Sequence, residues 1–236
     1  MAQPLSIPLS RMSIAFIGVI GLWSGQQTLL AQPPAPATAP ASAPADKAPA
    51  PPSGPKTETL RVLGLALTAM TRGSEFATAA AAKADAEKLP GAASLFRTAS
   101  RSQQIHADLV RAQIVALGGT PSVDASVKMP EVKETAANLA AALKALTSLK
   151  ETDLPAWRRA ADAEGNRNAV NAFRFAREGT IELSRFVKDL AEASQTTREL
   201  KKDYFVSRTC GFVVEKLDFQ KCPVCRAGRD DFEKVN

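Results

Sequence analysis

The residues best suited to chemistry lie near the C-terminus, where all three cysteines of the chain are found. Cys222 and Cys225 form the C-x-x-C of KCPVCRAG, and Cys210 lies in YFVSRTCGF. A C-x-x-C turn brings two thiolates to one side of a tight loop, and two such loops facing each other make a tetrahedral sulfur site for iron or zinc. Ser207 stands three residues before Cys210, where a full site would need a fourth cysteine.

Three interpretations of these four residues remain open from the sequence. In the first, which we favour, one iron or zinc ion binds through Cys210, Cys222 and Cys225, with the Ser207 oxygen or water as the fourth ligand. Serine is a weak ligand because its hydroxyl must lose a proton of much higher pKa before it binds as an anion. In the second, Cys222 and Cys225 form a disulfide in an oxidising compartment and Cys210 stays free. In the third, the segment is a metal-free remnant.

The scaffold that positions these residues is predicted from apolar residues that recur at helical spacing in four segments. The stripe positions are Leu60, Leu63, Leu67 and Met70; Phe96, Ala99, Gln103, His106, Val110 and Leu117; Val132, Ala136, Leu139, Leu143, Leu146 and Leu149; and Val170, Phe173, Ala176, Thr180, Leu183, Val187 and Leu190. A longer connection containing Pro121 and Pro130 precedes the third segment, and Pro155 is expected to kink or end that helix. This pattern predicts a four-helix bundle.

Polar residues occupy three of the stripe positions, namely Gln103, His106 and Thr180. Buried polar groups need partners, so we expect these side chains to hydrogen-bond one another or the backbone. A two-metal carboxylate site in a bundle needs several inward carboxylates, but no stripe carries aspartate or glutamate, and Glu178 and Glu182 fall outside the fourth stripe. The lone histidine has no cysteine partner on the bundle, and no nucleophile elbow is present, which argues against a hydrolase.

The N-terminal part has the layout of an export signal and a tether. Residues 1–31 place Arg11 before a short apolar run and end in LLA, which predicts a signal peptide cleaved after Ala31. The run is too short to span a bilayer comfortably, so we expect a periplasmic protein without a stable membrane span, an uncleaved anchor being the alternative. Residues 32–56 are rich in proline, alanine and serine and are predicted to be a disordered linker.

The charge pattern does not favour nucleic-acid binding. The net charge of +6 comes from basic residues that are scattered among acidic ones along the helical segments. Such residues form solvated helix faces rather than a basic footprint. We therefore predict no nucleic-acid partner.

From about Thr57 to Val235, the chain resembles the rubrerythrin family. The resemblance rests on LFRTASRSQQIHADL, NLAAALKAL, LPAWRRAADAEGN, AFRFAREGTIEL and the tail YFVSRTCGF…KCPVCRAGRDDF, in this order. It implies a mainly α fold, with a ferritin-like four-helix bundle over 57–200 and a small rubredoxin-like metal-knuckle domain over 203–236. In that family the bundle holds two irons and reduces peroxide, with electrons relayed through an Fe(Cys)4 centre in the tail.

The resemblance also assigns the family's seven di-iron ligand positions, and His106 alone keeps the family's residue type. The positions are Met70 in the first helix, Gln103 and His106 in the second, Leu146 and Leu149 in the third, and Thr180 and Leu183 in the fourth. Losing every carboxylate removes the charge that would balance two cations, so we expect no di-iron centre. We expect apolar side chains to fill the space instead.

The tail fits the family more closely than the bundle does. Gly211 and Pro223 match its knuckles, whereas Arg226 stands where the family usually has glycine. We expect a non-enzymatic, exported member with one iron or zinc in its tail and an unidentified redox or protein partner. The alternative is an oxidoreductase that reduces peroxide or transfers electrons. The family's dimers further imply a homodimer.

Overall fold

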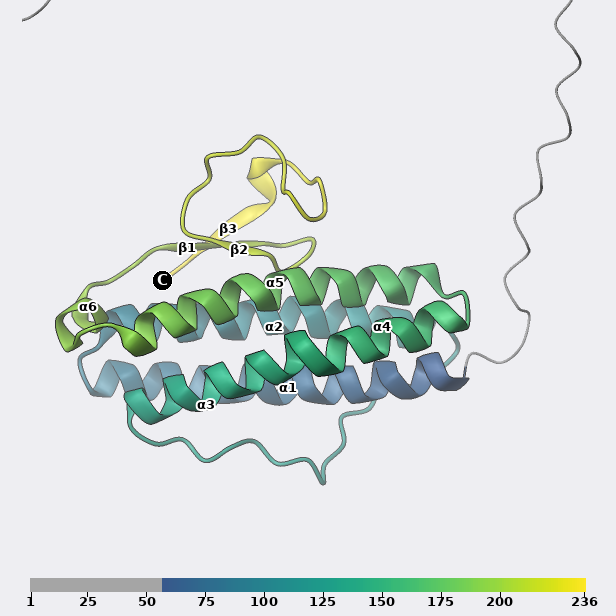
Figure 1. Ribbon diagram of the computed structural model, residues 1–236, viewed down its shortest axis with the longest axis horizontal. Helices are drawn as coiled ribbons and strands as arrows, with labels where there is room; N and C mark the ends of the chain where they lie inside the picture. Colours follow the sequence, from purple (N-terminus) through teal and green to yellow (C-terminus); the bar gives the residue numbers. More distant parts are fainter. Residues whose placement is uncertain (1–56) are drawn as a thin grey trace, which may run out of the picture. The chain divides into compact units, whose positions relative to one another are not determined.

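The computed structural model describes residues 57–236, and the predicted signal peptide and linker lie outside this part of the chain. The helical elements are α1 (Thr57–Ala86), α2 (Pro90–Ala116), α3 (Thr135–Ser148), a π-helical turn (Leu149–Asp153), α4 (Leu154–Ala163), α5 (Arg167–Glu192) and α6 (Gln195–Glu199). Helices α1 and α2, the α3–α4 pair and α5 lie side by side (Figure 1). The connection 117–134 runs back along the bundle. The predicted fold class, a mainly α ferritin-like bundle, is confirmed.

The helix ends are set by residues that suit them. Pro90 occupies the first turn of α2, where an amide would have no helical partner, and Gly118 follows that helix with φ of 76°. The Asn166 side chain accepts a hydrogen bond from the Ala169 amide at 3.1 Å and so caps α5. These local signals fix where the long helices begin and end.

The expected interruption at Pro155 is a local widening rather than an end of the helix. The π-helical turn Leu149–Asp153 stands directly before α4, and the Leu154 amide donates to the Leu149 carbonyl, five residues earlier. Proline has no amide to continue the α-helical ladder, and a wider turn accommodates its ring. The third arm of the bundle therefore continues through α4.

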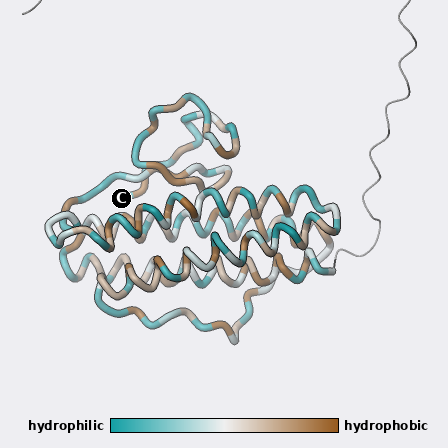
Figure 2. Tube along the Cα trace, in the orientation of Figure 1, coloured by the Kyte–Doolittle hydropathy of each residue, from teal (hydrophilic) through white to brown (hydrophobic). Residues whose placement is uncertain are grey.

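The core of the bundle consists of two apolar clusters, and hydrophobic residues recur along each helix (Figure 2). On the third arm, Leu146 belongs to one cluster and Leu149 to the other. On α5 the clusters are separated between Ala176 and Leu183, where the buried Thr180 lies. The clusters thus meet at the level of the polar stripe residues.

The tail is a three-stranded antiparallel sheet with two loops. It consists of β1 (Tyr204–Ser207), β2 (Val213–Val214), a 3-10 turn (Arg229–Asp231) and β3 (Phe232–Val235). Strand β1 is central, pairing Val206 with Val213 on one side and Ser207 with Phe232 on the other. Its buried residues Tyr204 and Val206 belong to the same apolar cluster as α2 and α5 residues, so the sheet is packed against the bundle.

No helix between residues 57 and 236 has the length and hydropathy needed to cross a membrane.

Candidate metal site

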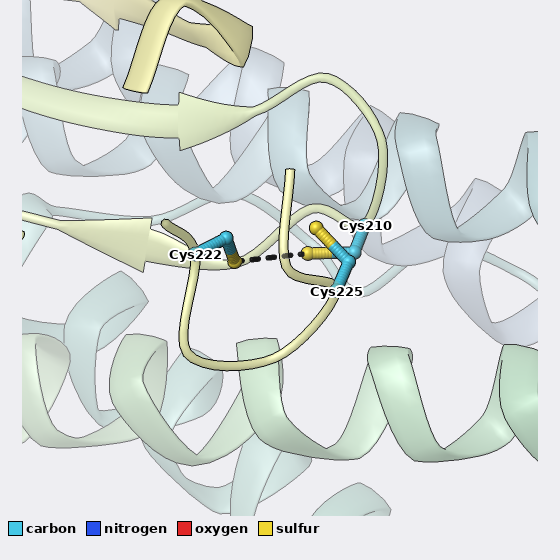
Figure 3. Close-up of side chains that lie close together, drawn as sticks. All are labelled: Cys210, Cys222 and Cys225. Atoms are coloured by element: carbon cyan, nitrogen blue, oxygen red, sulfur yellow. Dashed lines mark hydrogen bonds between the residues drawn. The ribbon is translucent and has the colours of Figure 1, made fainter. Parts of the chain in front are cut away.

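The three cysteine side chains converge on one point in the tail. Their sulfur atoms lie within 4.8 Å of one another, and the Sγ atoms of Cys210 and Cys222 are 3.8 Å apart (Figure 3). All three are free thiols, with Cys210 and Cys222 fully buried and Cys225 half-buried. Tetrahedral coordination with Zn–S bonds of about 2.3 Å separates sulfurs by about 3.8 Å, so this spacing suits one shared ion.

The first cysteine loop is held by backbone hydrogen bonds that follow directly from the end of β1. The Ser207 amide donates to the Phe212 carbonyl at 2.9 Å, and the Gly211 amide donates to the Ser207 carbonyl at 2.8 Å. Gly211 has φ of 71°, a left-handed conformation that glycine adopts without strain. The turn directs Ser207 and Cys210 toward the second loop.

The second loop is closed in the same manner. The Arg226 amide donates to the Cys222 carbonyl at 3.0 Å, and the Cys222 amide donates to the Ala227 carbonyl at 2.8 Å. Arg226 has φ of 67°, so an arginine occupies a left-handed position that favours glycine. The loop keeps the geometry of a metal knuckle in spite of this substitution.

Ser207 occupies the fourth corner of the site. Its Oγ lies 3.3 Å from the Cys210 sulfur and 3.7 Å from the Cys225 sulfur. The hydroxyl donates a hydrogen bond to Asp231 Oδ2 at 2.6 Å and accepts one from the Cys210 amide at 3.2 Å. The structure therefore brings together all four residues that the spacing predicted.

Asp231 is a site residue that sequence reasoning missed. It accepts hydrogen bonds from the Ser207 hydroxyl and from both the amide and the hydroxyl of Thr209, the latter two at 3.2 and 2.8 Å. Burial acts to raise the pKa of Asp231, but these hydrogen bonds hold it below its ordinary value. The pairing of Ser207 with Phe232 places Asp231 beside the site, and residue spacing does not reveal that register.

The electrostatics of the thiols differ within the site. Burial raises the pKa of Cys210 and of Cys222. Burial acts in the same direction on Cys225, but hydrogen bonds from the Ala227 amide and from neighbouring side chains lower its pKa below the ordinary value. A cation bound among these sulfurs would favour their thiolate forms, so the donor set fits a metal ion.

The cysteine site is fastened to the bundle through the first loop. His106 Nε2 lies 3.1 Å from the Cys210 carbonyl oxygen, and the Ser102 hydroxyl donates to the Gly211 carbonyl at 2.7 Å. Burial lowers the pKa of His106 to about 4, and the bond to the carbonyl opposes that shift. A Cβ on Gly179 or Gly211 would come closer to the His106 ring than van der Waals contact allows. Two glycines thus permit this close approach.

The seven positions that the resemblance assigns to a di-iron centre are all buried in the bundle. They are Met70, Gln103, His106, Leu146, Leu149, Thr180 and Leu183. This donor set contains one imidazole, one amide and one hydroxyl, but no carboxylate to balance two cations in a low-dielectric interior. The residues present therefore do not fit a di-iron centre. Among residues 57–236, the three tail cysteines are the only group of three or more His, Cys, Asp or Glu side chains that lie close enough together to hold a metal ion.

The predicted hydrogen bonds among the polar stripe residues are only partly correct. His106 does bond a backbone carbonyl, although that carbonyl belongs to the tail. Gln103 Oε1 and Thr180 Oγ1 are buried and have no hydrogen-bond partner among the described residues, so the prediction of mutual bonds is wrong. The reason is that the tail, whose docking the sequence does not show, supplies the acceptor for His106.

The expected apolar filling of the region that the resemblance assigns to the di-iron ligands is also incomplete. Gln103, Leu146, Leu149 and Leu183 line a cavity of about 320 Å³. Helices that pack against one another along their whole length cannot move closer at one level only. Where the side chains between them are small or poorly matched in shape, space therefore remains. The interior is apolar as predicted, but it is not closed.

A four-helix bundle joined to a small sheet with clustered cysteines defines a ferritin-like protein with a rubredoxin-like knuckle. The rubrerythrin family model matches residues 62–179. The chain belongs to the rubrerythrin family. No curated protein matches it.

Among solved structures, the fold is similar to that of nigerythrin. The fully reduced, all-ferrous state is 24% identical with a TM-score of 0.64, and the mixed-valence state is 23% identical with a TM-score of 0.62. Both matches cover 80% of this chain and 90% of the nigerythrin chain. At this identity the likeness concerns the fold.

Proposed function

We propose that the protein binds one iron or zinc ion in its tail and holds no metal pair in its bundle. The observation that carries this proposal is that the sulfurs of Cys210, Cys222 and Cys225 lie within 4.8 Å of one another. The loop that carries Cys210 is hydrogen-bonded to His106 of the bundle. The ligand positions inside the bundle lack the carboxylates that two cations need.

The three cysteines would hold the ion, with the Ser207 oxygen or water in the fourth place. When bound, the ion supplies positive charge to a buried set of thiols and cross-links the two loops of the tail. Asp231 orients the Ser207 hydroxyl, since it accepts that hydrogen bond at 2.6 Å. The sheet and both loops keep the site in place against α2 and α5.

The role that follows is binding or interaction, such as metal handling, rather than catalysis in the bundle. Residues 1–31 support export to the periplasm, and N-terminal sequencing of the protein from that compartment tests this part: a mature chain that begins at Gln32 is expected. We also propose a homodimer, because members of the family pair as dimers. Light scattering of the purified protein measures its mass and so the number of chains.

Cobalt titration tests the metal site, because cobalt bound by thiolates gives charge-transfer absorption. We expect the absorption to reach a plateau at one ion per chain in the full-length protein and to be lost in Cys222→Ser. Met70→Leu, in the apolar cluster of the bundle that contains no tail residue, is the matched control and leaves the stoichiometry unchanged. A plateau that persists in Cys222→Ser, or one that falls in Met70→Leu, contradicts the proposal. A Cys222–Cys225 disulfide in freshly isolated protein would also contradict it.

The substitution Ser207→Cys tests the fourth position. A thiol loses its proton far more easily than a serine hydroxyl, so the variant should bind iron more tightly and form a red centre. Thr209→Cys is the control, since Thr209 is a nearby residue whose side chain faces Asp231 instead of the sulfurs. Equal gains in both variants would show that Ser207 does not occupy a ligand position.

Electron transfer is a second candidate function, and the hydrogen bond between His106 and the Cys210 carbonyl favours it. This bond joins the backbone of a ligand residue directly to the bundle interior. Voltammetry of the iron-loaded protein, followed by a measurement of electron exchange with a reductase, distinguishes electron transfer from metal binding alone. A reversible couple that slows in His106→Ala supports electron transfer, and zinc as the native ion excludes it.

A further inference from the structure

The apolar cavity in the bundle is a feature that the metal site does not use. Its walls are apolar side chains from α1, α2, α3 and α5, including Phe76, Phe96, Leu146 and Leu183. Its volume of about 320 Å³ lies at the lower end of the range of roughly 300–1,000 Å³ that small-molecule sites have. An apolar cavity of about 150 Å³ already binds benzene, so this space suits a molecule the size of two fused rings.

One polar side chain lines this space without a partner. Gln103 is 4% exposed, and its Oε1 has no hydrogen-bond partner among residues 57–236. A buried carbonyl without a partner is unfavourable, and a ligand that carries a donor satisfies it. A hydroxyl both donates and accepts, so it suits the amide in either of its orientations.

The mouth of the cavity lies between α1 and the end of α3. Ala69 and Ala145 line it from these two helices, and both are exposed. Ser148 and Asp153 add polar groups there and bond each other at 3.3 Å. No lysine, arginine or histidine of the described chain lines the cavity. An acidic mouth without a cation disfavours carboxylates and phosphates and admits neutral molecules.

We propose that the cavity binds a small, neutral, mainly apolar molecule with one hydroxyl group, which enters between α1 and α3 and donates to Gln103. The α1, α2, α3 and α5 side chains hold its apolar body, and Asp153 rejects anionic analogues at the mouth. This binding site is separate from the tail cysteines and does not depend on the proposed tail ion, but it rests on the part of the proposed function that leaves the bundle without a metal pair.

Calorimetry of the full chain with three bicyclic probes tests the proposal. We expect one 2-naphthol per chain, with naphthalene bound about tenfold more weakly because it lacks a hydrogen bond of roughly 1.4 kcal/mol. The carboxylate probe, 2-naphthoate, should bind at least as weakly as naphthalene, and Asp153→Asn should improve its binding. Equal affinity for 2-naphthol and naphthalene, or no binding of either up to the limit of solubility, overturns the proposal.

Two variants locate the bound probe. Gln103→Leu should retain naphthalene and lose the tenfold preference for 2-naphthol, whereas Gln104→Leu, the same change at the exposed neighbouring residue, should keep it. Ala142→Phe places a ring in the cavity and should abolish binding of both probes while circular dichroism shows an intact bundle. Should Ala142→Phe not fold, Gln103→Leu decides: an unchanged preference in that variant overturns the proposal.

Discussion

The tail and the centre of the bundle derive from the same family pattern, but they have kept different parts of it. In the tail, the proposed ligands Cys210 and Cys222 are also core residues, since they form an apolar cluster with Phe212 and Phe232. In the bundle, the ligand positions are a small part of a core that the rest of the helices complete. A metal-binding side chain is therefore easier to lose where the fold does not depend on it.

The bundle illustrates this independence. Its helices satisfy their own backbone hydrogen bonds, and two apolar clusters hold them together on either side of the former ligand level. The leucines at positions 146 and 183 are compatible with such an interior. The small sheet of the tail has no comparable reserve of buried apolar surface, and small domains commonly depend on a metal for stability.

Metal removal should affect the two regions very differently, and this is the largest effect we expect. Stripping the ion with a chelator should increase amide hydrogen exchange across β1–β3 by about two orders of magnitude, the effect of losing a ligand present at roughly 100 times its Kd. Exchange in α1 and α5 should stay nearly unchanged. Mass spectrometry of exchanged peptides measures both regions in one sample. Equal loss of protection in the bundle would contradict the comparison.

A carboxylate introduced into the bundle interior should destabilise the fold, because the interior offers no cation to balance its charge. Leu183 is fully buried, so Leu183→Glu should lower the free energy of unfolding by about 3 kcal/mol at neutral pH. Asn171→Glu, on an exposed position of the same helix, is the control and should change it little. Urea denaturation measures both variants.

The pH dependence of the Leu183→Glu variant provides a further check. Burial raises the pKa of the introduced carboxyl group above its unfolded value of about 4.3. The destabilisation is therefore complete above the folded-state pKa and should shrink as the pH falls toward the unfolded value. A loss of stability that does not depend on pH would point to a steric cause instead of a buried charge.

The contact between the two regions should be sensitive to one methyl group. Gly211→Ala would strain a backbone with φ of 71° and press against His106, so we expect a loss of about 2 kcal/mol and easier proteolysis of the tail. Gly118→Ala is matched in backbone strain, with φ of 76° and no atom within 4 Å, and should cost about half as much. Equal effects would show that the His106 contact is unimportant.

The smallest expected effect is a gain at Arg226. Arg226→Gly should stabilise the tail by about 0.5–1 kcal/mol, since it relieves a left-handed conformation at φ of 67°. Lys88→Gly relieves a similar strain at φ of 59° between α1 and α2 and should instead stabilise the bundle. Hydrogen exchange assigns each gain to its region. A change in the metal affinity of Lys88→Gly would contradict the independence of the tail from the bundle.

The sequence predicted the features that depend on local pattern. Four helices follow from apolar spacing, and the cysteine cluster follows from C-x-x-C geometry with Ser207 at the equivalent position of the first loop. Features that depend on packing between distant segments were not predictable. Asp231 reaches the site through strand register, His106 finds its acceptor in the tail, and the cavity beside Gln103 reflects how closely the helices approach.

The number of metal ions per chain tests the central claim most directly. The full-length protein and a variant with Cys210, Cys222 and Cys225 all changed to serine would be loaded with excess ferrous iron or zinc without oxygen, desalted, and measured by elemental analysis. We predict one ion per chain in the native protein and none in the variant. Two further ions per chain that persist in the variant would show that the bundle still holds a metal pair and would contradict the account.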